Sequence, residues 1–312
     1  PNIVKDALSA GLHGNLLRLF LADALVYQRR KNKACSRAGG TMKRLVLLTL
    51  ATLISHPAMS ADSGFPLYDM TPDLTDQSSL QRGAQTYMNY CLGCHSLQYQ
   101  RYKRTAEDIG IPESLMLEYL VFDPNTKIGD LIENSISDEN SKNWFGAVPP
   151  DLTLYSQLKG GPEYLYTYLL TFYEDASRPL GANNLVYENV GMPHALMELQ
   201  GVQQKVCKEI PKLADNGGQM MDALSQAYIT EQVCGMELVE RGYSPLQLVE
   251  NSGRLSPEAY EQVVYDLTNF IYYVGDPSRL DRERTGVFVL IFLAFFFVPA
   301  YLLAREYKKE IH

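Results

Sequence analysis

The sequence predicts an all-α, loop-rich domain over residues 62–280, followed by one C-terminal transmembrane helix over residues 285–304. Three observations support this fold class. Apolar residues recur at helical spacing in several stretches of the domain. No stretch alternates apolar and polar residues as a half-buried strand does. The C-terminal stretch has no charged residue at all.

The N-terminal part of the sequence predicts export. Residues 42–61 begin with Met-Lys-Arg, continue with a short apolar run, and end with small residues, which is the pattern of a secretory signal peptide. The apolar run is too short to span a bilayer comfortably. Residues 1–41 precede this signal, and two interpretations stay open: an amphipathic membrane-surface helix, or an over-extended reading frame that is removed or never made. We favour the second.

Three helices are expected within the domain. Leu80–Cys91 carries apolar residues at helical spacing, and Ser78 or Ser79 is the expected cap. A shorter helix is expected over Tyr164–Phe172. A third begins at Ser256 with Pro257 in its first turn, and its apolar stripe runs to about residue 274.

Residues 285–304 are long enough to cross a hydrocarbon core of roughly 30 Å as a helix. Pro299 is tolerated in a membrane helix. The tail at residues 305–312 contains Arg305, Lys308 and Lys309, which favours a cytoplasmic position for it. With the signal peptide, this places the domain outside the cytoplasmic membrane. A buried core helix is the alternative.

Charge and motif content exclude several functions. The net charge of −8 disfavours nucleic-acid binding, which normally needs a basic patch to displace counterions. The sequence has no Gly-rich phosphate loop, GxSxG elbow or HExxH pair. Nucleotide-binding and hydrolase functions therefore have little support.

One motif carries specific chemistry. Residues 91–95 read Cys-Leu-Gly-Cys-His, a C-x-x-C-H pattern. Its two thiols, Cys91 and Cys94, are close enough to bind the vinyl groups of one haem, and His95 then supplies the proximal iron ligand. The pattern therefore predicts one covalently bound haem c.

Three other interpretations of this motif were weighed. A redox-active dithiol usually lies at a strand-to-helix junction. A zinc site needs two further ligands, and Cys207 and Cys234 are not a close pair. A plain structural disulfide needs no adjacent histidine. The haem interpretation fits an exported chain best.

The sixth iron ligand decides between electron transfer and gas or peroxide binding. Met192 stands out because Gly191 lets the backbone approach closely and Pro193 stiffens the loop. His194 is its near neighbour, so the residues alone leave both open. A thioether ligand favours the ferrous state and raises the potential.

The chain resembles the cytochrome c1 family over roughly residues 65–312. The resemblance rests on motifs that occur together and in order: Gln81-Arg82-Gly83 followed by residues 91–95, Val148-Pro149-Pro150-Asp151-Leu152, Gly160-Gly161, Tyr164-Leu165-Tyr166-Thr167-Tyr168-Leu169, Asn183-Asn184, Asn189-Val190-Gly191-Met192-Pro193-His194, and the C-terminal membrane helix. Several motifs in order are far more specific than the C-x-x-C-H pattern alone.

The resemblance implies the haem subunit of a bacterial cytochrome bc1 complex (ubiquinol–cytochrome c reductase). Such a subunit is not an enzyme on its own. It takes electrons from the Rieske iron–sulfur protein, passes them to a c-type cytochrome, and assembles with cytochrome b in the inner membrane, with its haem domain in the periplasm. By the same resemblance Met192 is the sixth ligand and the loop around Pro150 lies against the haem.

The sequence departs from the family pattern in two places. Where the family usually has an Arg-x-Arg pair before the two glycines, this chain has Gln157-Leu158-Lys159. Lys159 is then the candidate for the haem propionate, although it is a point donor and not a planar fork. Residues 200–255 look longer than the minimal family pattern and contain Cys207 and Cys234, for which an oxidising periplasm favours a disulfide. Two free buried thiols are the alternative.

Overall fold

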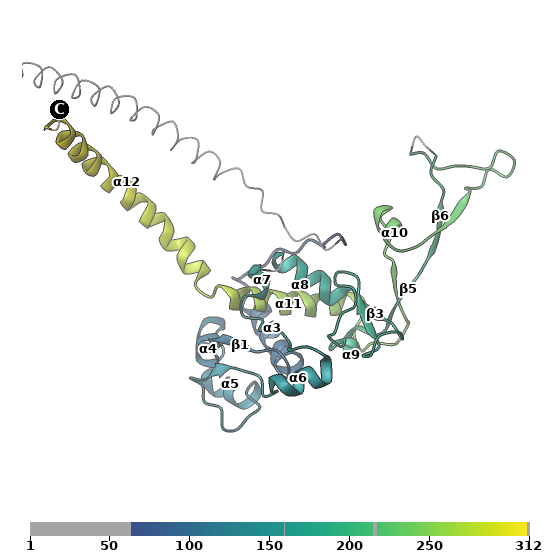
Figure 1. The fold of residues 1–312 in the computed structure, drawn as a ribbon, viewed down its shortest axis with the longest axis horizontal. Helices are drawn as coiled ribbons and strands as arrows, with labels where there is room; N and C mark the ends of the chain where they lie inside the picture. Colours follow the sequence, from purple (N-terminus) through teal and green to yellow (C-terminus); the bar gives the residue numbers. More distant parts are fainter. Residues whose placement is uncertain (1–63, 159, 215–216, 311–312) are drawn as a thin grey trace, which may run out of the picture. The chain divides into compact units, whose positions relative to one another are not determined.

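The computed structural model of the chain describes residues 64–158, 160–214 and 217–310 (Figure 1). The predicted extension 1–41, the signal peptide 42–61, Lys159 and the last two residues lie outside these ranges. The helices are α3 (Gln77–Tyr90), α4 (Tyr102–Ile109), α5 (Glu113–Tyr119), α6 (Asp138–Phe145), α7 (Tyr155–Leu158), α8 (Gly161–Leu170), α9 (Met197–Gln200), α10 (Met236–Glu240), α11 (Pro257–Gly275) and α12 (Arg279–Glu310). The strands are β1 (Leu97–Arg101), β2 (Leu131–Ile132), β3 (Phe172–Glu174), β4 (Ala182–Asn184), β5 (Gln203–Lys205), β6 (Lys208–Pro211), β7 (Thr230–Val233) and β8 (Leu246–Leu248).

Helices α3 and α11 pack against each other at the centre of the domain (Figure 1). Gly83 permits this close crossing, because a Cβ atom there would lie 2.0 Å from the backbone oxygen of Asp266. The rings of Tyr87 and Phe270 meet beside it, with centroids 5.9 Å apart. Arg82 forms two hydrogen bonds with the buried carboxylate of Asp266, at 2.6 and 3.0 Å. The negative charge of Asp266 is therefore paired inside the helix interface.

Helices α7 and α8 cover another side of α11. Tyr260 on α11 donates a hydrogen bond to the backbone oxygen of Leu169 at 2.9 Å, and Ser156 on α7 donates to that of Ile271 at 3.2 Å. Two left-handed glycines, Gly160 (φ 73°) and Gly161 (φ 81°), open α8. A side chain would strain this turn, which explains why two glycines stand there.

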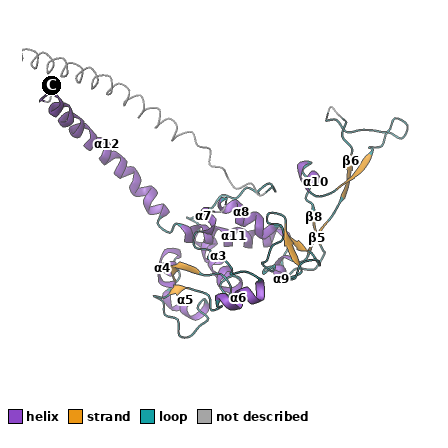
Figure 2. Cartoon of the chain, viewed as in Figure 1, coloured by secondary structure: helices purple, strands orange, loops and turns teal. Residues whose placement is uncertain are grey.

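The helical prediction is correct for the core and wrong for the connections. The described chain contains four two-stranded antiparallel sheets, drawn in orange in Figure 2. They pair β1 with β2, β3 with β4, β5 with β8, and β6 with β7. Each strand has two to five residues, too few for an alternating pattern to be visible in the sequence.

The predicted helices are present with shifted ends. The predicted cap of α11 is confirmed, since the Ser256 side chain accepts a hydrogen bond from the backbone N–H of Ala259. The cap of α3 is Asp76 and not Ser78 or Ser79; its carboxylate accepts from the Ser79 N–H. Helix α8 begins earlier than expected and ends before Phe172, which belongs to β3.

A long hairpin, residues 206–235, is here called the arm. A disulfide joins Cys207 and Cys234 at its base, next to the paired strands β6 and β7. A small apolar cluster of Ile210, Val233 and Leu238 supports this base. Further along the arm several apolar side chains are exposed, namely Leu213, Met220, Met221, Leu224, Tyr228 and Ile229.

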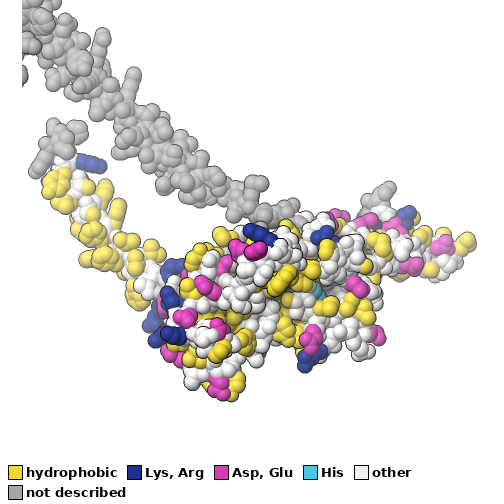
Figure 3. Space-filling model, turned by 60° about the horizontal axis from the view of Figure 1, so that its bottom comes forward, with side chains coloured by type: hydrophobic (Ala, Val, Ile, Leu, Met, Phe, Trp, Pro, Cys, Tyr) yellow, Lys and Arg dark blue, Asp and Glu magenta, His cyan; other side chains and the backbone are white. Residues whose placement is uncertain are grey.

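Helix α12 contains the predicted span 285–304 and is longer, from Arg279 to Glu310. Apolar side chains cover its surface (Figure 3) and are exposed along its length. It is the one helix of the described chain that is long and apolar enough to cross a membrane. Pro299 lies inside it without ending it, as expected for a membrane helix.

Candidate haem-binding site

The C-x-x-C-H segment forms a tight turn at the end of α3. Cys91 caps the helix with its N–H bonded to the Tyr87 oxygen at 2.9 Å. The N–H groups of Cys94 and His95 then donate to the Cys91 oxygen at 3.0 and 2.9 Å. The buried Tyr87 hydroxyl donates to the backbone oxygen of His95, and the Asn134 side chain donates to that of Cys94. The turn is therefore held from both the helix and the following loop.

The ring of His95 has one nitrogen engaged. Its Nδ1 lies 2.7 Å from the backbone oxygen of Pro150. A carbonyl oxygen only accepts, so Nδ1 carries the proton and Nε2 keeps its lone pair. Burial lowers the pKa of His95, which keeps the imidazole neutral. A neutral ring with a free Nε2 is the form that binds iron.

The Pro150 loop is fixed against the strand that follows His95. The Asp151 carboxylate accepts from the Gln98 N–H at 2.8 Å, and the Leu152 N–H donates to the Ser96 oxygen at 3.0 Å. Pro150 thus contributes its backbone oxygen to the site, through the His95 ring. This role has no side-chain signature.

Cys91 and Cys94 are free thiols. Burial raises the pKa of Cys91 to about 12 and also raises that of Cys94. A thiol–disulfide oxidoreductase needs a lowered thiol pKa, so this pair is poorly suited to that chemistry. Nor do three or more His, Cys, Asp or Glu side chains gather into a metal site anywhere in residues 64–158, 160–214 and 217–310. The dithiol and zinc interpretations lose support.

Met192 lies in a second, smaller apolar cluster with Phe172, Ala182 and Val190. Tyr168 packs on this cluster and also on the main core that contains the end of α3. Its hydroxyl lies 3.5 Å from the Met192 Sδ and donates a weak hydrogen bond to it. The Met192 sulfur still has a lone pair that can bind a metal.

One ring nitrogen of His194 forms a hydrogen bond with a neighbouring side chain. Its Nε2 lies 2.7 Å from the Gln200 Oε1, and the Gln200 amide nitrogen donates to the Leu170 oxygen at 3.2 Å, which fixes the direction of the amide. The His194 ring stacks on Phe172 at 4.8 Å. Burial lowers the pKa of His194 to about 4. Gln200 thus occupies one of the two ring nitrogens of His194 and fixes the ring against Phe172, whereas the Met192 Sδ has only one weak hydrogen bond; this favours Met192 of the two candidates that the sequence left open.

The donor set fits one haem c: two free thiols, one imidazole nitrogen and one thioether. Met192 packs on the smaller cluster and Cys91 on the main core, and Tyr168 contacts both clusters. His95 and Met192 would hold the iron of this haem. Lys159 lies outside the described residues, and its role toward a propionate stays a prediction.

Three contributors were missed by the sequence analysis: Asn134, Tyr168 and Gln200. Tyr168 lies in a tyrosine-rich run, but nothing in that run distinguishes it from Tyr164 or Tyr166. Asn134 and Gln200 act across the fold, 40 residues from Cys94 and 30 from Leu170 respectively. No local pattern marks such residues.

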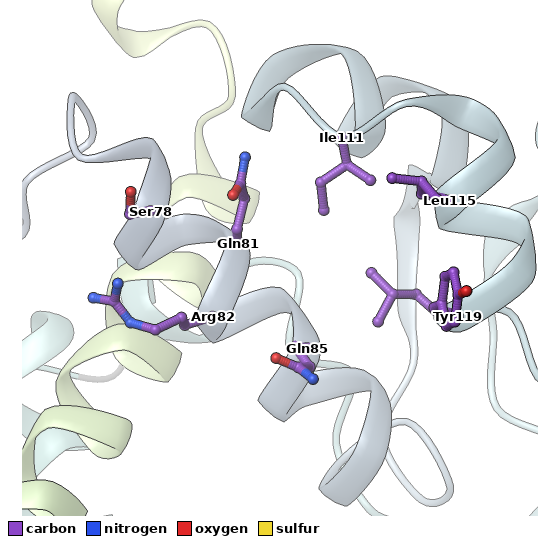
Figure 4. Close-up of a pocket in the computed structure, with 8 residues that line it drawn as sticks. Ser78, Gln81, Arg82, Gln85, Ile111, Leu115 and Tyr119 are labelled. Carbon is purple, nitrogen blue, oxygen red and sulfur yellow. The ribbon is translucent and has the colours of Figure 1, made fainter.

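One cavity of the described chain is not part of this site. It has a volume of about 390 Å³ and lies between α3 and α5. Ser78, Gln81, Arg82 and Gln85 line it from the polar face of α3, with apolar residues around Leu115 opposite them (Figure 4). None of the predicted site residues lines it.

Comparisons with known proteins identify the family of the chain. A model of the Cytochrome C1 family matches residues 68–206. Cytochrome c1 of Allochromatium vinosum is 43% identical over 87% of this chain and 100% of its own length. A protein of Nitrosomonas europaea named ammonia monooxygenase gamma subunit is 34% identical over 87% and 100%. Cytochrome c1 of Rhodobacter capsulatus is 22% identical over 75% and 85%. The chain therefore belongs to the cytochrome c1 family, whose members carry one covalently bound haem c.

Proposed function

We propose that this chain is the haem-carrying electron-transfer subunit of a bacterial quinol–cytochrome c reductase. It accepts electrons from the Rieske iron–sulfur protein and passes them to a c-type cytochrome, in a complex with cytochrome b. The observation that carries the proposal is the His95 ring beside two free thiols, with Nδ1 engaged by Pro150 and Nε2 left free.

Each site residue has a definite task in this proposal. Cys91 and Cys94 hold the haem through thioether bonds, while His95 Nε2 and Met192 Sδ bind its iron. Pro150 fixes the His95 ring through its carbonyl oxygen, and Lys159 remains the candidate for a propionate. The haem supplies one-electron redox chemistry when bound. No acid, base or nucleophile is needed, so the chain is not an enzyme on its own.

The proposed topology follows the export signal and the anchor. Residues 42–61 direct export, 62–280 form the periplasmic haem domain, 285–304 span the inner membrane, and 305–312 lie in the cytoplasm. Residues 1–41 are a spurious or removed extension. The exposed apolar surface of α12 supports the anchor. Basic residues at its end support the orientation.

A redox titration of the Met192→Leu protein tests this function. Leucine preserves the volume but cannot bind iron, so covalent haem should remain while the midpoint potential falls by on the order of 100 mV, because axial ligands set haem potentials over a wide range. The matched control is Met197→Leu, since Met197 is half exposed and outside the site. An unchanged potential in Met192→Leu would refute the ligand assignment.

A second candidate function comes from the relative named ammonia monooxygenase gamma subunit. The chain could carry electrons in a different oxidoreductase with the same haem site. Purification of the tagged chain in mild detergent separates the two. Recovery of cytochrome b and a Rieske protein supports the reductase, whereas recovery of monooxygenase subunits without cytochrome b supports the second candidate.

A further inference from the structure

The loop that presents Met192 is anchored by an arginine from a neighbouring turn. Arg178 lies in the turn that joins β3 and β4. Its Nη2 donates to the backbone oxygens of Asn189 at 2.9 Å and Val190 at 3.3 Å, and its Nη1 donates to the Asn189 Oδ1 at 3.2 Å. These acceptors lie two and three residues before Met192.

The turn that carries Arg178 is itself well fixed. The Asp175 N–H donates to the Gly181 oxygen, the Arg178 N–H to the Asp175 oxygen, and the Gly181 N–H to the Arg178 oxygen, each at 3.0 Å. The Asp175 carboxylate accepts from the Ser177 hydroxyl and N–H and from the Asn183 side chain, and these hydrogen bonds lower the pKa of Asp175. The Arg178 side chain therefore extends from a turn that is held by several hydrogen bonds.

A second contact holds the same loop from β4. The Asn183 Oδ1 accepts the backbone N–H of Asn189 at 2.9 Å. Asn189 has a left-handed backbone with φ 59°, which asparagine tolerates better than most residues. With its N–H held by Asn183 and its C=O by Arg178, Asn189 is fixed on both sides.

The hydrogen bonds of Arg178 are directed at this loop, while Asp175 in its own turn feels the charge without forming an ion pair with it. All three of its side-chain hydrogen bonds end on Asn189 or Val190. Within the described ranges no carboxylate forms an ion pair with it, and its Nε is buried without a hydrogen-bond partner. The Arg178 guanidinium, with backbone oxygens of the 189–190 segment as its hydrogen-bond partners, is suited to hold this segment in place.

We propose that Arg178 is a positioning residue for the axial methionine. One arm of its planar fork, Nη2, holds the consecutive carbonyl groups of Asn189 and Val190, the other arm, Nη1, holds the Asn189 side chain, and together they keep Met192 from leaving the iron. This inference rests on the proposed function, in which Met192 is the sixth ligand. Lysine offers one point donor and cannot reproduce the fork.

The test uses the full-length haem-loaded chain in detergent. The fraction of Met192 released is read from the rate of carbon monoxide binding to the ferrous protein and from the methionine-to-ferric-iron absorption band. Arg178→Gln should raise the carbon monoxide rate about tenfold, which corresponds to about 1.4 kcal/mol in the release equilibrium. Arg178→Lys should lie between Arg178→Gln and the wild type.

Arg254→Gln is the matched control, because Arg254 forms an exposed ion pair with Glu198 and should behave as the wild type. Wild-type carbon monoxide rates in both Arg178 variants would overturn the inference. If Arg178→Gln does not accumulate, Arg178→Lys decides alone, and a wild-type rate there is equally negative.

Met192→Leu separates this inference from the proposed function. If Met192→Leu loses the band while both Arg178 variants keep wild-type behaviour, the ligand assignment stands and the positioning role is wrong. If Met192→Leu leaves the band and potential unchanged, the ligand assignment is wrong and the role of Arg178 falls with it.

Discussion

His95 illustrates how a backbone group determines the chemistry of a side chain. The hydrogen bond to the Pro150 oxygen places the proton on the Nδ1 of His95, and burial lowers the pKa of the ring and keeps it neutral. A side-chain acceptor could titrate and change the tautomer with pH, whereas a carbonyl oxygen cannot. The site therefore presents the same nitrogen over a wide pH range.

Tyr168→Phe should lower the midpoint potential. The Tyr168 hydroxyl donates to the Met192 sulfur at 3.5 Å and withdraws electron density from it, which disfavours the ferric state. Since a weak hydrogen bond contributes roughly 0.5 kcal/mol, and 59 mV corresponds to a tenfold change for one electron, a fall of about 20 mV is expected. Redox titration measures it.

Tyr164→Phe is the control for this change, because Tyr164 stacks on Tyr168 but has no hydrogen bond with Met192. Equal potentials for the wild type and Tyr168→Phe would show that the hydroxyl does not act on the sulfur.

At the scale of elements, the crossing of α3 and α11 positions the C-x-x-C-H turn at residues 91–95. Cys91 ends α3, so any change in the crossing moves both thiols and His95 together. Asn269 on α11 adds a further restraint, since its side chain donates to the Asp73 oxygen at 2.8 Å and to the Ser79 hydroxyl at 3.1 Å.

Gly83→Ala should destabilise the domain strongly. A Cβ atom would lie 2.0 Å from the Asp266 oxygen and 2.7 Å from the Phe270 Cβ, so the helices must separate. Overpacking of this kind costs about 3 kcal/mol or more. Denaturant unfolding followed by circular dichroism measures the loss. Gly129→Ala is the control, because a Cβ there meets nothing within 4 Å; similar midpoints for both variants would contradict the close crossing.

Elements with local signals were predictable from the sequence. Helix α11 begins at Pro257 after its Ser256 cap because a cap, a first-turn proline and an apolar stripe all lie within one stretch. The sheets were not predictable, because their strands are short and several of them pair with segments far apart in sequence, as Gln203 does with Leu248. The same holds for the site. Residues 91–95 are recognisable from their own C-x-x-C-H pattern, whereas the Pro150 carbonyl contacts His95 from 55 residues away in the sequence.

At the scale of the whole molecule, one apolar helix follows a polar domain. The α12 side chains are exposed in the described chain and have no protein partner there to cover them. A bilayer would bury this surface, at a gain of roughly 25 cal/mol per Å² of apolar area. Anchoring and haem binding are therefore assigned to separate parts of the chain.

A chain that ends after Leu280 should separate these two parts. Without α12 it should appear in the soluble periplasmic fraction with its haem covalently attached and its spectrum unchanged, because the core residues all precede the cut. Fractionation followed by haem staining measures this, with the full-length chain in the membrane fraction as the control. A truncated protein that stays with the membranes would indicate a second means of attachment.

The disulfide at the base of the arm has a consequence for how the chain matures. Cys207 and Cys234 are joined, while Cys91 and Cys94 are free thiols. Thioether formation with a haem vinyl group requires a reduced thiol, so the proposed function needs Cys91 and Cys94 reduced while Cys207 and Cys234 are oxidised. A disulfide between Cys91 and Cys94 would remove both thiols at once and would have to be reduced before the haem could attach. The proposed function therefore requires the two cysteine pairs of one chain to reach different redox states during maturation.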